Sequence, residues 1–117
     1  MSEKYEDARL DRAIASILDV WRGSGKISCV KISTGSMEPF IRPGAIVVVD
    51  HSTKDFRIGD IVVFRNSDHM TAHRIVAVNE GHSGIIFQTR GDNTADRSES
   101  VPEALVMGKV IEVHNSL

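Results

Sequence analysis

The sequence has few of the residues expected in a disulfide-stapled, membrane-spanning or nucleic-acid-binding protein. Its 117 residues include one cysteine, Cys29, so no disulfide can form within the chain. The longest unbroken aliphatic run, Ala45 to Val49, is far shorter than the roughly 20 residues that a membrane-spanning helix needs. Fourteen basic residues against 16 acidic ones give a net charge of -2 without a basic block. This balance argues against a nucleic-acid partner, and the length predicts one domain.

Residues 1–25 are predicted to form an N-terminal amphipathic helix and a linker. Helix formers dominate from Glu3 to Arg22, and Gly23-Ser24-Gly25 is a typical helix stop. Apolar residues recur at three- and four-residue spacing, namely Leu10, Ile14, Ile17, Leu18 and Trp21. Because both signs of charge lie on the polar face, attraction to anionic lipid should be weak. We expect the apolar face to pack on the chain's own domain; a partner helix or a membrane surface are the alternatives.

Neither a secretory signal nor a membrane span is expected from the sequence. The protein is therefore predicted to be soluble and cytoplasmic. Peripheral membrane attachment or partner docking through the N-terminal helix is the alternative.

Residues 26–117 have the pattern of a β domain. Short β-branched runs are separated by turn residues such as Arg42-Pro43-Gly44 and Gly91-Asp92-Asn93. The six predicted strands are KISCVKI, AIVVVD, DIVVFR, HRIVAVN, GIIFQTR and LVMGKVIEV. They predict a mainly β fold, a compact sheet or barrel. The polar segment DRSESVPE, residues 96–103, is predicted to be an exposed loop.

Ser36 is the candidate nucleophile. It follows Gly35 where a strand gives way to a turn, and glycine allows the close backbone approach that lets the Ser36 amide face a developing oxyanion. Thr34, two residues upstream, would lie on the same face of an extended chain. The alternative interpretation is an ordinary turn rich in serine and threonine.

A serine nucleophile needs a base, and His73 is the best placed of the five histidines. It lies at the start of a predicted strand, whereas His51, His69 and His82 have the surroundings of loop residues. A partly exposed strand histidine is the simpler interpretation. Asp92 and Asp96 are the acids available to orient a histidine or to fix its loop, although GDN is also a common turn.

A metal site is not expected. Asp68, His69 and His73 offer ligands, but two residues four apart on a strand are about 13 Å distant along the chain. No cofactor is predicted either.

Five motifs in order make the prediction specific: STGSMEPF, IGDIVVF, TAHRIVAV, FQTRGDN and MGKVI. Together they resemble the type I signal peptidases, in the branch found in archaea, the endoplasmic reticulum and some Gram-positive bacteria. The resemblance implies that Ser36 is the nucleophile and that Thr34, in place of a serine, helps to form the oxyanion hole. His73, before Arg74, stands where the bacterial branch has a lysine base.

The resemblance also implies that Asp92 and Asp96 are the site's acids. Asp96 is the looser match, because the segment after GDN is shortened here. Two features depart from the family. Gly44-Ala45 replaces Gly-Asp, and an amphipathic helix stands where signal peptidases have a membrane anchor. The related LexA-like self-cleaving repressors share the fold but use a lysine base, and His73 argues against them.

The sequence thus predicts a serine endopeptidase that needs no metal or cofactor. Ser36 would attack, His73 would take the proton, and Asp92 with Asp96 would support His73. The partner would be a peptide or protein bound as an extended strand, with cleavage after small residues as the resemblance implies. The alternative is a catalytically idle peptide- or protein-binding domain on the same fold.

Overall fold

The computed structural model describes residues 26–66, 69–94 and 97–115. The predicted helix and linker at 1–25, and Asp96, lie outside the described residues. Within the described ranges, no helix is long and apolar enough to cross a bilayer.

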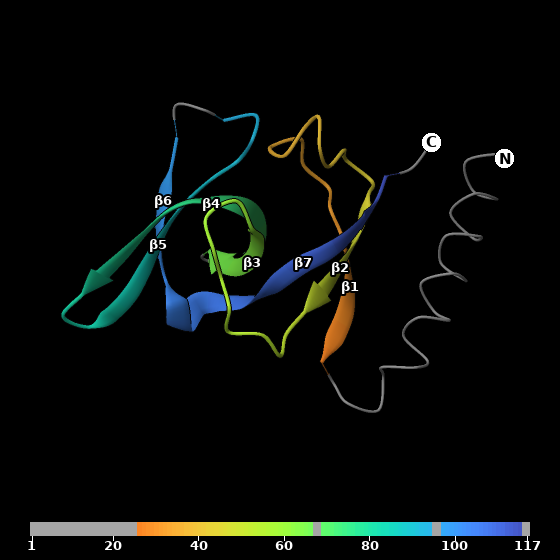
Figure 1. The fold of residues 1–117 in the computed structure, drawn as a ribbon. Helices are drawn as coiled ribbons and strands as arrows, with labels where there is room; N and C mark the ends of the chain where they lie inside the picture. Colours follow the sequence, from red (N-terminus) through yellow and green to blue (C-terminus); the bar gives the residue numbers. More distant parts are fainter. Residues whose placement is uncertain (1–25, 67–68, 95–96, 116–117) are drawn as a thin grey trace, which may run out of the picture.

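Seven strands form one antiparallel sheet, ordered β1-β2-β7-β3-β4-β5-β6 (Figure 1). The strands are β1 (Ile27–Lys31), β2 (Ile46–Asp50), β3 (Ile61–Asn66), β4 (His69–Gly81), β5 (Gly84–Arg90), β6 (Glu99–Pro102) and β7 (Val106–His114). A short 3-10 helix, η2 (Glu103–Leu105), joins β6 to β7. The mainly β prediction is confirmed. The barrel alternative is wrong for the described chain, because β1 and β6 end the sheet and do not pair with each other.

Strand β3 explains how one sheet supports two hydrophobic clusters. Ile61 and Val63 belong to a cluster with β2 and the loop after β1, while Val62 and Phe64 belong to a second cluster with β4 to β7. Alternate side chains of a strand point to opposite faces, so a strand buried on both faces has a continuous apolar run. The sequence IVVF at the start of β3 is such a run, and all four residues are buried.

Strand β6 corrects the prediction of an exposed loop at 96–103. Glu99–Pro102 pairs with β5, and Val101 is buried in the second cluster. Only one of its four residues is a large aliphatic. The alternation that turns Glu99 and Val101 to the same face was therefore too weak to predict a strand. The edge of β5 supplies the pairing that the local sequence does not specify.

Candidate active site

Ser36 lies in the loop between β1 and β2, and two buried side chains fix this loop to the first cluster. Met37 is 1% exposed and Ile41 is fully buried. The Ile41 amide donates to the Met37 carbonyl at 2.9 Å, which closes a helical turn immediately after the serine. At the base of the loop, the Gly44 amide donates to the Ile32 carbonyl at 2.7 Å. Ser36 is therefore held half-buried on an anchored turn.

His73 approaches Ser36 from β4. It is buried, it is the cross-strand partner of Val62, and its ring lies edge-on to Phe64 with the ring centroids 6.1 Å apart. Its Nε2 atom is 3.1 Å from Ser36 Oγ, and its Nδ1 atom is 2.6 Å from Glu99 Oε1. With the ring proton on Nδ1 donated to the carboxylate, Nε2 is free to accept the serine proton.

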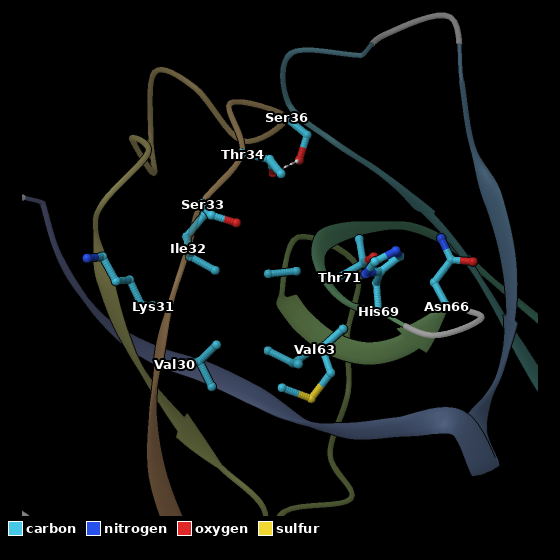
Figure 2. A pocket seen from close by; sticks show the side chains of 12 residues that line it. Val30, Lys31, Ile32, Ser33, Thr34, Ser36, Val63, Asn66, His69 and Thr71 are labelled. Carbon is cyan, nitrogen blue, oxygen red and sulfur yellow. Dashed lines mark hydrogen bonds between the residues drawn. The ribbon is translucent and has the colours of Figure 1, made fainter.

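Thr34 lies beside Ser36, as its two-residue spacing predicts. Its Oγ1 atom is 3.5 Å from Ser36 Oγ, and Figure 2 shows the two side chains together at one end of a cavity. Thr34 is exposed, so its hydroxyl can turn toward a bound substrate. The arrangement offers a second donor near the oxygen of an attacked carbonyl.

The GDN turn after β5 lies against the serine loop. The Asn93 amide donates to the Ser36 carbonyl at 2.8 Å, and its side-chain nitrogen donates to the Gly35 carbonyl at 3.2 Å. Both loops lie along the top of the view in Figure 1. Asn93 of the GDN turn therefore fixes the backbone at Gly35 and Ser36.

Asp92 contacts Arg74 and not His73. Its two carboxylate oxygens accept from Arg74 Nε and Nη2 at 2.9 and 2.8 Å. These hydrogen bonds raise the pKa of the Arg74 guanidinium, which also donates to the Gly59 carbonyl and lies over the Phe40 ring. The carboxylate that the structure places on His73 is that of Glu99.

Glu99 was absent from the sequence-based site. It lies on β6, in the segment predicted to be a loop, and neither a motif nor a resemblance marks it. The one available signal was its position two residues before Val101, which puts both side chains on one face if the segment is extended. That signal becomes usable only when a strand is assigned there.

A cavity of about 460 Å³ begins at Ser36 and runs between β1 and the β3–β4 hairpin (Figure 2). Val30 and Ile32 line one side, and Val63 lies across the cavity from them. The remaining lining residues are Lys31, Ser33, Thr34, Asn66, His69, Met70, Thr71 and Ala72. The sides of the cavity thus carry both apolar and polar side chains, and the hydroxyls of Thr34 and Ser36 lie at one end.

His69 and His73 both lie on β4, although His69 was predicted to be a loop residue. In the part of the chain that the structure describes, no three histidine, cysteine or acidic side chains are grouped to hold a metal ion. The chemistry that the arrangement supports is proton transfer between a hydroxyl and an imidazole.

Several relatives are similar to this chain. It is 32% identical over 74 residues to signal peptidase I W of Bacillus subtilis, covering 61% of this chain and 38% of that protein. It is 33% identical over 88 residues to the signal peptidase complex catalytic subunit sec11 of Dictyostelium discoideum, covering 68% of this chain and 49% of the relative. The chain thus spans about half the length, or less, of these two curated relatives.

These similarities confirm the resemblance to signal peptidases that the motifs indicated. A family model described as Peptidase S24-like matches residues 2–111, which is nearly the whole sequence. The chain belongs to the Peptidase S24-like family.

Proposed function

We propose that this protein is a serine endopeptidase with a Ser36–His73 catalytic pair. The observation that supports it most is the 3.1 Å contact between Ser36 Oγ and His73 Nε2, made by residues from an anchored loop and a central strand. Such a contact lets the imidazole accept the hydroxyl proton as the oxygen attacks a carbonyl carbon. Membership of a peptidase family supports the same proposal.

The proposed reaction has two stages. Ser36 Oγ bonds to the scissile carbonyl carbon while His73 takes its proton, and the Ser36 amide and Thr34 hydroxyl stabilise the negative carbonyl oxygen. The tetrahedral intermediate then collapses, and His73 gives the proton to the leaving amine. Water, deprotonated by His73, hydrolyses the acyl-enzyme in the second stage and restores Ser36.

The proposed substrate is an extended peptide segment in the cavity beside Ser36. The cavity borders β1, an edge strand of the described sheet, so a peptide can add to the sheet through main-chain hydrogen bonds. The similarity to proteins named signal peptidases supports cleavage after small residues. In this proposal residues 26–117 form the catalytic domain.

The apolar stripe predicted for the segment 1–25 is proposed to pack on this domain. Recruitment of the domain to a partner or a membrane surface through the same stripe is the alternative. Asp92 is proposed to support the site indirectly, by holding Arg74 beside the GDN turn. Support of His73 by Asp96 stays a prediction.

Mass spectrometry of a peptide library that includes A-x-A sequences tests the proposal. The library is incubated with the wild type, Ser36→Ala and His73→Ala, with and without detergent micelles. Cleavage by the wild type that both substitutions abolish is the expected result. If the folded wild type cleaves nothing in either condition, the peptidase proposal fails and the peptide-binding domain becomes the better interpretation.

A further inference from the structure

We propose that Glu99 is the positioning residue for His73, in the role that was predicted for Asp92 and Asp96. This inference rests on the proposed function, because it concerns the same base. Glu99 Oε1 lies 2.6 Å from His73 Nδ1, which is a short contact of the kind that a charged acceptor makes. The two side chains are 28% and 11% exposed, so water competes weakly for the contact.

The carboxylate of Glu99 is itself held by a buried hydroxyl. Thr89 is fully buried, and its Oγ1 donates to the same Glu99 Oε1 atom at 2.9 Å. One oxygen therefore accepts from both a threonine and a histidine, which fixes its direction. The resulting series of side-chain contacts runs from Ser36 through His73 and Glu99 to Thr89.

The sheet register explains why Glu99 can reach His73. Glu99 on β6 is the cross-strand partner of Thr89 on β5, and Thr89 is in turn the partner of Ile75 on β4. Ile75 and His73 are two residues apart on one strand and so face the same side. Three neighbouring strands thus present Glu99, Thr89 and His73 to one face.

Asp92 is engaged elsewhere. Both of its oxygens accept from Arg74, so the aspartate of the GDN turn has its own cationic partner. Among the described residues, Glu99 contacts the neutral hydroxyl of Thr89 and the imidazole of His73. When His73 gains a proton during catalysis, its positive charge would therefore lie beside the negative charge of Glu99.

A second serine–histidine contact supplies an internal comparison. Ser28 Oγ is 2.6 Å from His51 Nε2, but His51 Nδ1 lies 2.8 Å from the carbonyl oxygen of Met107. A neutral carbonyl can fix the tautomer of an imidazole, but it stabilises an imidazolium less than a carboxylate does. Of these two contacts, the one between Ser36 and His73 has a carboxylate, that of Glu99, on the second ring nitrogen.

The test compares Glu99→Gln, Thr89→Val and Asp96→Asn with the matched control Glu80→Gln, an exposed position on the strand that carries His73. Glu99→Gln is expected to lower kcat by about 10²- to 10⁴-fold with little change in KM. The reason is that a glutamine can turn its amide nitrogen, instead of an accepting oxygen, toward His73 Nδ1. Thr89→Val should lower kcat by a smaller factor, and Glu80→Gln should leave kcat unchanged.

Nuclear magnetic resonance of the histidine ring protons tests the contact between Glu99 and His73 without requiring peptidase activity. A far-downfield proton on His73 Nδ1 is expected in the wild type and should move upfield in Glu99→Gln, while the His51 signal stays in place. A wild type that shows this signal but cleaves no peptide would leave the Glu99 contact standing and defeat only the peptidase proposal. Wild-type kcat and an unmoved His73 proton in Glu99→Gln, or a loss confined to Asp96→Asn, would overturn the inference.

Discussion

A β-carbon on Gly91 would lie 2.6 Å from the carbonyl oxygen of Ser36, closer than any real side chain approaches such an atom. It would also meet Thr94 Oγ1 at 2.7 Å and His73 Nε2 at 3.1 Å. The turn after β5 therefore lies against the Ser36 loop and His73 with no space for a methyl group. The glycine of the GDN motif is required for close approach, and its backbone does not occupy the left-handed region.

Replacement of Gly91 should consequently damage both the site and the fold. We expect Gly91→Ala to reduce kcat/KM by at least roughly tenfold, because Ser36 and His73 must separate, and to lower the free energy of unfolding by about 1–3 kcal/mol. Gly81→Ala is the matched control, since its β-carbon would meet nothing closer than the Gly84 carbonyl oxygen at 3.7 Å. Peptide hydrolysis and urea unfolding measure the two effects. Equal behaviour of the two variants would contradict the close-packing argument.

The Thr34 hydroxyl is predicted to contribute to catalysis through its hydrogen bond alone. Thr34→Val preserves the shape but removes the donor, so kcat should fall by about 10²-fold with KM unchanged. Thr34→Ser keeps the donor and is expected to retain most of the activity. Steady-state kinetics on one peptide distinguishes the two. If the serine and valine variants are equally active, Thr34 is not an oxyanion donor.

The bidentate contact between Arg74 and Asp92 is predicted to depend on the guanidinium group of arginine. Arg74→Lys keeps the charge but cannot make both hydrogen bonds to the carboxylate, and it loses the contact with the Gly59 carbonyl. We expect the free energy of unfolding to fall by about 1 kcal/mol. The control is Arg57→Lys, whose exposed contact with Asp55 should contribute nothing measurable. Urea titrations of both variants decide whether the effect is specific to Arg74.

Activity is predicted to decline as the pH falls from about 8 to about 5, because only a neutral imidazole can accept the Ser36 proton. Activity therefore falls, and does not rise, at lower pH, because the protonated form of the base is inactive. kcat/KM is measured across this range, and circular dichroism at each pH verifies that the fold persists. A flat profile with an intact fold would count against His73 as the base.

The local sequence determined most of the strands, and it offered Ser36 and His73 as candidates that the resemblance to signal peptidases made specific. Alternating or continuous β-branched runs are local patterns, so they identify β2 and β3 without knowledge of their neighbours. Gly35 beside Ser36, and a histidine opening a β-branched run, are equally local. Nothing in these patterns required the strands to close into a barrel, and the described sheet has two edges.

Only the tertiary structure decided which carboxylate lies against His73. Glu99 and Asp92 are both acids within 26 residues of His73, and the sequence favoured Asp92 because it belongs to a motif. The contact instead depends on β6 adding to the edge of β5 in the register that sets Glu99 opposite Thr89. Pairing between strands is specified by packing across the whole sheet, since a shift of one residue would turn Glu99 to the other face. A weakly patterned segment such as β6 acquires its position from the strand that it joins.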